Sequence, residues 1–413
     1  MLGALVALCL GASPGAKAVM ARFECHRCHE VEGLAPPPTV KHCAGCHREL
    51  AGSANDAAKL EQGRKTYGDA FDRFVRRTAT HYVDVPPLVS MRRFRASWLR
   101  SFLADPLDLR PHLTESMPRL PLTPADLDAL TSGLPADAPA PAASPEQLAL
   151  GARLFEAKAC TSCHLFGTRR FPSQPAALFE VKAPAISVLA RAPDLRHVRD
   201  RLNRDVVVKL LRSPRAVNAR AQMPNPGLSR AEAEALADFL LQGALGPPVE
   251  PEAVPVAQHV GPARYEDVEA RVFRKVCWHC HSNPDFVDGE GGPGNTGGFG
   301  FKGAGLSLAT YEEVMNGSLG PDGEYRSLFR KGPSGEPVLL EVLRRRVEEN
   351  ARDFVRPGHE ASRAPLASAG PLGMPLGLPA LAPDDLALVE AWIAAGKPRP
   401  ATPPGLQLTP MGR

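Results

Sequence analysis

The strongest constraint on this chain is a five-residue pattern, Cys-X-X-Cys-His, that occurs four times along it. The four copies occupy residues 25–29, 43–47, 160–164 and 277–281. The chain has 413 residues, with 9 Cys and 12 His. Random placement at that composition gives roughly 0.006 copies of the pattern. The repetition is therefore a functional feature, and it takes up every cysteine except Cys9.

The spacing of this pattern suits covalent attachment of a c-type haem. Two thiols three positions apart reach the two vinyl groups of one haem as thioethers, and the histidine that follows binds the iron. We therefore predict four covalently bound c-type haems, each with one iron. The cysteines that would carry them are Cys25, Cys28, Cys43, Cys46, Cys160, Cys163, Cys277 and Cys280, and the proximal ligands are His29, His47, His164 and His281.

The first two copies have an alternative interpretation, because their four cysteines are also spaced like two zinc knuckles. A zinc site would not explain why a histidine follows both second cysteines. It would also not explain why the two later copies stand alone. Haem is therefore favoured at all four positions, with zinc as the alternative for the first pair.

The first eighteen residues have the pattern of an export signal. Residues 1–10 form an apolar run, and a small-X-small cleavage pattern ends at Ala18. We predict a signal peptide at 1–18, cleaved after Ala18, and a periplasmic or otherwise exported protein. Because no Lys or Arg precedes Lys17, the alternatives are an uncleaved anchor, which would associate the N-terminus with a membrane, and a lipid on Cys9.

Two Pro-rich stretches divide the rest of the chain into three haem-carrying parts. We predict a dihaem domain at 19–134, a monohaem domain at 146–246, a monohaem domain at 263–398, linkers at 135–145 and 247–262, and a disordered tail at 399–413. A Gly-rich insertion at 289–300 is interpreted as a loop over a haem edge, because no Lys-Ser or Lys-Thr follows it as in a phosphate-binding loop. The net charge of +4 is spread without a polybasic block, so no nucleic-acid partner is expected.

Apolar residues recur at helical spacing around the motifs, which predicts an all-α fold of tandem small helical domains with Pro-rich linkers and irregular loops. Thr123 before Pro124, and Ser229 with Glu232, mark helix starts. No helix of ordinary length is expected before Cys25. An Arg-rich helix expected at 338–349 is predicted to be solvated.

A second repeated feature is a Met-Pro step, which occurs at Met117, Met223 and Met374. Each step comes shortly before the last predicted helix of its domain. With this order of helix, Cys-X-X-Cys-His, loop, helix, Met-containing loop and final helix, the chain resembles class I cytochrome c. The resemblance implies that Met223 is the sixth ligand of the haem on His164, and Met374 that of the haem on His281.

The first domain departs from that family, because it has two haem motifs and one Met-Pro step. We assign Met117 to the haem on His47, following the family's order. The haem on His29 then needs another ligand. His81 is favoured because its segment is aromatic and flanked by proline, and His42 and His112 are the alternatives.

The resulting hypothesis is an exported tetrahaem c-type cytochrome that carries single electrons between redox protein partners. Six-coordinate irons leave no open position for a substrate, so no catalytic residue is predicted. The competing hypothesis is a haem oxidoreductase, of peroxidase or oxyanion-reductase type, in which one haem of the first domain is five-coordinate. A third is a zinc-stabilised interaction module joined to a dihaem cytochrome.

Overall fold

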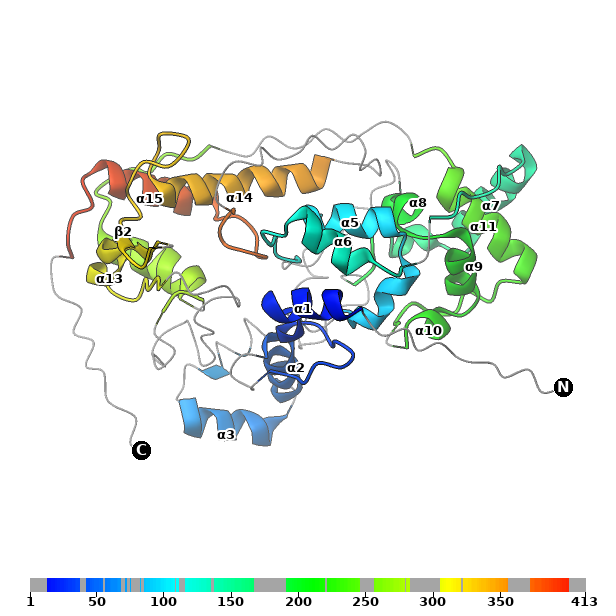
Figure 1. Ribbon diagram of the computed structural model, residues 1–413, viewed down its shortest axis with the longest axis horizontal. Helices are drawn as coiled ribbons and strands as arrows, with labels where there is room; N and C mark the ends of the chain where they lie inside the picture. The colour runs from blue at the N-terminus through cyan, green and yellow to red at the C-terminus, as the bar shows by residue number, and fades with distance from the viewer. Residues whose placement is uncertain are drawn as a thin grey trace. The chain divides into compact units, whose positions relative to one another are not determined.

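A computed structural model describes most of the chain (Figure 1). The described residues are 13–37, 42–54, 56–67, 71–72, 75, 82, 85–107, 109–110, 116–134, 137–166, 191–219, 221–245, 256–278, 280–282, 305–320, 322–355 and 372–400. The predicted Gly-rich insertion, His81, His112 and residues 401–413 of the predicted tail lie outside them.

Two compact units make up the chain. The first comprises Met1–Pro251, Glu349–Ser368 and Leu376–Leu378, and the second comprises Glu252–Glu348, Ala369–Pro375 and Pro379–Arg413. In the described residues the only sheet is a ribbon of β1 (Ser318–Leu319) and β2 (Tyr325–Arg326). The prediction of a helix-rich, all-α fold is therefore confirmed. None of the helices described has both the length and the apolar character needed to span a bilayer.

The first core of unit 1 forms where α1 (Pro14–Arg22) packs against α6 (Pro124–Thr131). Ala16, Val19 and Met20 of α1 are buried there. Helix α5 (Ala96–Ala104) adds Trp98, Leu99 and Leu103 to the same core.

The expectation that no helix precedes Cys25 is therefore wrong. Ser13 caps α1 by accepting a hydrogen bond from the Ala16 amide (3.1 Å), and Pro14 occupies the first turn, as at many helix starts. Cleavage after Ala18 would divide α1 in its middle, so the signal peptide at 1–18 stays a prediction.

The second core of unit 1 is organised by the crossing of α7 (Pro145–Ala157) and α11 (Arg230–Gln242). Phe155, Phe166 and Phe239 form an aromatic cluster with ring centroids 5.1–5.6 Å apart. The short helices α8 (Val198–Arg201), α9 (Arg204–Arg212) and α10 (Pro214–Val217) complete it.

A smaller cluster in unit 1 belongs to α2 (Cys43–Ser53), which packs against α3 (Ala57–Tyr67). Its buried residues are Leu50, Phe71 and Val75. Cys46 of the second motif packs against them. The 3-10 helix η3 (Leu88–Arg93) follows this part of the chain.

Unit 2 has a third apolar core, centred on Trp278 and Trp392, which are fully buried. Helix α12 (Tyr265–Val268) continues into a π-helix, η7 (Glu269–Cys277), and α12 packs against α15 (Pro383–Ala394). Helices α13 (Tyr311–Asn316) and α14 (Val338–Val355) also contribute. Because Leu339, Leu340 and Leu343 of α14 are buried in this core, the prediction of a solvated helix is wrong.

Candidate haem-binding sites

The first motif folds into one tight turn. Glu24 has a left-handed backbone (φ 49°, ψ 41°), and Cys25–Arg27 form the 3-10 helix η1. The Cys25 carbonyl accepts hydrogen bonds from the amides of Cys28 (3.2 Å) and His29 (2.9 Å). Both thiols and the imidazole therefore come from a single turn, as one haem requires.

The third motif, in the second core, has the same local structure. Ala159 takes the left-handed conformation (φ 51°, ψ 38°) before the 3-10 helix η4 (Cys160–Ser162). The Cys160 carbonyl accepts from Cys163 (3.2 Å) and His164 (3.0 Å). Left-handed backbone is uncommon for residues other than glycine, so its recurrence at the same step of two motifs indicates one shared fold of the attachment turn.

A backbone carbonyl orients the imidazole in each of these two motifs. His29 Nδ1 lies 2.8 Å from the Pro86 carbonyl oxygen, and His164 Nδ1 lies 2.8 Å from that of Pro193. A carbonyl only accepts, so Nδ1 carries the proton and Nε2 keeps its lone pair for a metal.

Burial lowers the pKa of both His29 and His164, which favours the neutral imidazole that iron binds. The tautomer and the charge state therefore both fit a proximal haem ligand. These two motifs have the donor set that a c-type haem needs.

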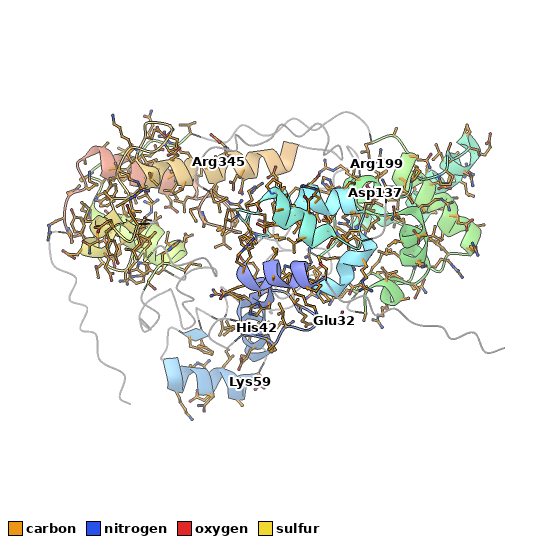
Figure 2. All side chains as sticks on the ribbon, in the orientation of Figure 1. Glu32, His42, Lys59, Asp137, Arg199 and Arg345 are labelled. Atoms are coloured by element: carbon orange, nitrogen blue, oxygen red, sulfur yellow. The ribbon has the colours of Figure 1, made fainter. Side chains whose placement is uncertain are left out.

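The second motif has a different backbone, because Cys43 begins the α-helix α2. His47 is buried, and its ring meets the Tyr82 ring edge-on at 5.4 Å between centroids. His42 lies at the start of α2 (Figure 2), and its ring packs against Gly45 of the second motif. This position places His42 beside the second motif.

The fourth motif closes with the same backbone hydrogen bonds as the first and third. The Cys277 carbonyl accepts from Cys280 (3.1 Å) and His281 (2.9 Å). Trp278, between the cysteines, donates from its indole Nε1 to the Leu308 carbonyl (2.6 Å). Burial lowers the pKa of His281 and raises that of the Cys277 thiol to about 12. The motif is thus anchored inside the third core.

The three predicted methionine ligands lie in different surroundings. Met223 packs in the same core as Cys160, and Met117 in the same core as Cys25. Met374 donates its amide to the Val342 carbonyl (2.9 Å). Among the described residues, it is not part of the cluster that contains Cys277.

The predicted pairing of Met117 with the haem on His47 stays a prediction. Cys46 of that motif packs against the small cluster of α2, whereas Met117 and Cys25 pack against the first core. His81 and His112, the histidines considered for the haem on His29, lie outside the described residues.

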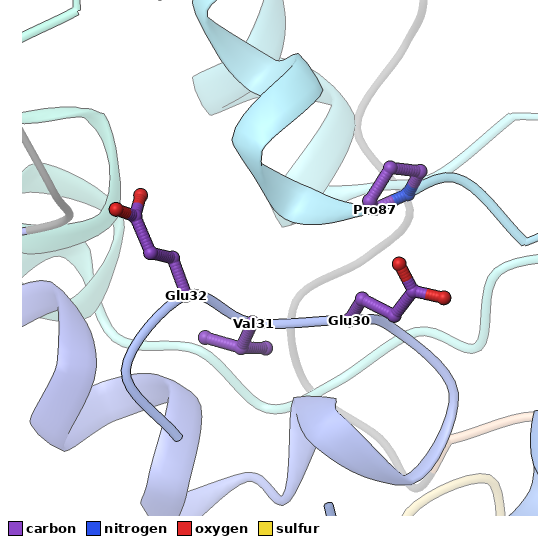
Figure 3. Close-up of a pocket in the computed structure, with 4 residues that line it drawn as sticks. All are labelled: Glu30, Val31, Glu32 and Pro87. Carbon is purple, nitrogen blue, oxygen red and sulfur yellow. The ribbon is translucent and has the colours of Figure 1, made fainter. Parts of the chain in front are cut away.

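A cavity of about 290 Å³ lies beside the first motif, lined by Glu30, Val31, Glu32 and Pro87 (Figure 3). The side chains of Glu30 and Glu32 project from one side of their segment and Val31 from the other. The cavity adjoins the Pro86 carbonyl that orients His29.

The zinc hypothesis for the first two motifs can be compared with the geometry of its ligands. Within the part of the chain that the structure describes, no three Cys, His, Asp or Glu side chains converge as metal ligands. The four cysteines of these motifs are all described.

Sequence reasoning missed Pro86 and Pro193, the residues that orient the proximal histidines. Their separations from the histidines are 57 and 29 residues. With such unequal separations, motif spacing gives no signal for them. The Pro-flanked segment around His81 was predicted only to supply a sixth haem ligand.

Residues 148–244 match the Cytochrome c family. The matched range contains the third motif, Pro193 and Met223. This part of the chain is therefore a cytochrome c domain, and it implies a covalently bound c-type haem with iron and haem-based electron transfer. No curated protein and no solved structure matches the chain.

Proposed function

We propose that this chain is an exported tetrahaem c-type cytochrome, built of tandem cytochrome c-like domains, that passes single electrons between redox protein partners. One observation carries the proposal. The first motif lies outside the range that matches the Cytochrome c family, yet it repeats the turn and the histidine-to-proline hydrogen bond of the third motif inside that range.

Local geometry supports extending haem attachment to the remaining motifs. The fourth motif shares the hydrogen bonds that close the turn, and its histidine has a lowered pKa because it is buried. In the second motif, His47 is buried in the described structure. Each proximal imidazole is at least partly shielded from water and would be available to iron, which would alternate between the ferric and ferrous states.

The packing of the methionines supports carriers rather than an open catalytic iron. Met223 packs in the core of Cys160 and Met117 in the core of Cys25, which supports them as sixth ligands of the haems on His164 and His29. A thioether ligand favours ferrous iron and raises the reduction potential. For the haem on His281, Met374 remains the sequence-based candidate. His81 remains a candidate in the segment next to Tyr82, which contacts His47.

The haem count tests the proposal. Intact-mass spectrometry and a pyridine haemochrome assay on the full exported chain should give four covalent haems per polypeptide. Two haems would contradict it and favour an N-terminal module without haem. Cell fractionation should find the haem-loaded chain outside the cytoplasm.

Spin state separates the carrier from the enzyme. We expect fully low-spin ferric spectra and no rapid cyanide binding, because every iron has two axial ligands. A high-spin ferric band that cyanide removes quickly would contradict the carrier function and support the peroxidase or oxyanion-reductase type.

A further inference from the structure

The loops that follow the first and third motifs start and end at equivalent points. In the first, the Glu30 carbonyl accepts from the Leu88 amide (2.9 Å); in the third, the Leu165 carbonyl accepts from the Leu195 amide (3.0 Å). Each acceptor directly follows the proximal histidine, and each donor lies two residues after the orienting proline. The histidine-to-proline separation is 57 residues in the first loop and 29 in the third. The first loop is thus the longer of the two, and the second motif lies within it.

Residues of the second motif and of its helix α2 contact the first motif. The thiols of Cys28 and Cys43 lie close enough to interact with each other. Helix α2 packs against the turn η1. Arg48 of α2 forms an ion pair with Glu30, the residue after His29, at 3.4 Å. Three different contacts therefore bring the two attachment turns together.

We propose that the segment between His29 and Pro86 is a haem-carrying insertion in the first haem domain, and that its haem forms a contacting pair with the haem on His29. This inference rests on the proposed function. In the loaded protein each of these sulfurs is bonded to a carbon at the edge of its porphyrin. Two attachment turns that pack against each other would therefore bring the edges of two porphyrins close, one from each motif.

The pair gives the insertion a role in electron transfer. An electron that passes within it oxidises one ferrous haem and reduces its ferric neighbour, and no bond is made or broken. The haem on His47 then serves as the route by which electrons reach or leave the haem on His29. The third motif has the shorter loop, and its haem has no such partner within that loop.

Arg27 places a buried positive charge at the junction of the two turns. It lies between the cysteines of the first motif, forms an ion pair with Glu24, and acts electrostatically on both Cys28 and Cys43. The third motif has uncharged residues at the two positions between its cysteines. Arg27 offsets the negative charge of Glu24 at this junction. Neutralising Arg27 would leave Glu24 unpaired, which disfavours the ferrous state of both haems.

The first experiment removes the second haem from the full chain with the double substitution Cys43→Ser and Cys46→Ser. We expect a three-haem protein that lacks the coupled Soret circular dichroism of a haem pair, with a changed potential for the haem on His29. The matched control, Cys277→Ser with Cys280→Ser, should also have three haems but keep the coupled signal. If the signal and the potential survive the first substitution, the pairing is wrong.

A second experiment keeps all four haems. In an EPR-monitored redox titration, Arg27→Gln should lower the potentials of the haems on His29 and His47 together and leave the haem on His164 unchanged. Arg27→Lys, which keeps the charge, should restore most of the shift. A change in only one of the two potentials would overturn the pairing. Fewer than four haems in the unmodified chain would instead overturn the proposed function.

Discussion

At the scale of single residues, backbone carbonyl groups orient two of the predicted proximal histidines. The Pro86 and Pro193 carbonyls fix the proton on Nδ1 of His29 and His164. Desolvation lowers the pKa of both histidines, so the neutral form is favoured and Nε2 keeps its lone pair for a metal. Backbone carbonyl groups near the motif thus determine which nitrogen of each imidazole carries the proton.

Met223→Ala tests the axial ligand in the matched domain. Losing the thioether should remove the sulfur-to-iron charge-transfer band of one haem and lower its reduction potential, because the ligand favours ferrous iron. Absorption spectroscopy and a redox titration measure both effects. Met315→Ala, which truncates a partly buried methionine in the core of Cys277, is the control and should leave the haem on His164 unchanged. An unchanged band in Met223→Ala would show that Met223 is only a packing residue.

Asp126→Asn tests a titratable group that holds the first core together. Asp126 accepts a hydrogen bond from the Thr123 amide (2.9 Å), closes the capping box of α6 and pairs with Arg22 of α1. Hydrogen bonds from the Thr123 backbone and side chain, and then Arg22, lower its pKa below the ordinary value of 3.8. We expect the substitution to reduce the free energy of unfolding by about 1 kcal/mol at pH 7.

This deficit should shrink as the pH falls below 4, because the wild-type carboxylate loses its contribution when it is protonated. Urea unfolding at pH 7 and pH 3 measures it. Asp128→Asn on the same helix is the control, since its ion pair with Arg100 is exposed and should contribute less. Equal deficits at both pH values would contradict the role of the charge.

At the scale of elements, the helix before a motif packs against the helix that ends the same region. This occurs for α1 with α6, for α7 with α11 and for α12 with α15. The starts of α6 and α11 are confirmed as predicted, with capping boxes at Thr123 and Ser229. Such starts depend on residues three apart, whereas the helix pairs join residues about a hundred apart.

Gly151→Ala tests the closeness of the α7–α11 crossing. A Cβ atom at Gly151 would lie 2.3 Å from the Ala235 carbonyl oxygen and 2.5 Å from Phe239 Cβ. Because a backbone atom must move, the substitution should lower the free energy of unfolding by about 1–3 kcal/mol. Chemical denaturation measures the loss.

Gly52→Ala in α2 is the matched control. A Cβ atom there meets nothing within 4 Å. Since alanine is the better helix former, this substitution should be neutral or stabilising by up to about 1 kcal/mol. A neutral Gly151→Ala would mean that the two helices are less closely packed than described.

At the scale of the whole molecule, the apolar cores are local to their units. Phe155 belongs to a core of unit 1, and Trp392 to the core of unit 2. Both side chains are fully buried. Each unit should therefore lose stability through its own core.

The paired substitutions Phe155→Ala and Trp392→Ala test this independence. Each should cost about 3–5 kcal/mol in its own core. Hydrogen-exchange mass spectrometry should show lost protection in α7 and α11 for the first, and in α13 and α15 for the second. Equal loss of protection in both units after either substitution would show that they unfold as one.

The sequence by itself determined the four Cys-X-X-Cys-His motifs, which we propose carry haem, and several helix starts. Each of these is encoded within five consecutive residues, where covalent geometry and capping leave few alternatives. Periodicity also predicted the helix-rich fold. It failed for the helix at 338–349, whose many arginines conceal the apolar face that packs in the third core.

Only the tertiary structure decided which distant residues serve each motif. It made α1 part of the first core, placed Met117 and Cys25 against that same core, and supplied the Pro86 and Pro193 carbonyls. It also placed Cys43 against Cys28. These contacts join residues separated by loops of unequal length, and a loop can grow at little entropic cost while its ends stay fixed. The spacing of residues along the chain therefore does not predict these contacts. They become visible only when the packing of the loop ends in the folded protein is known.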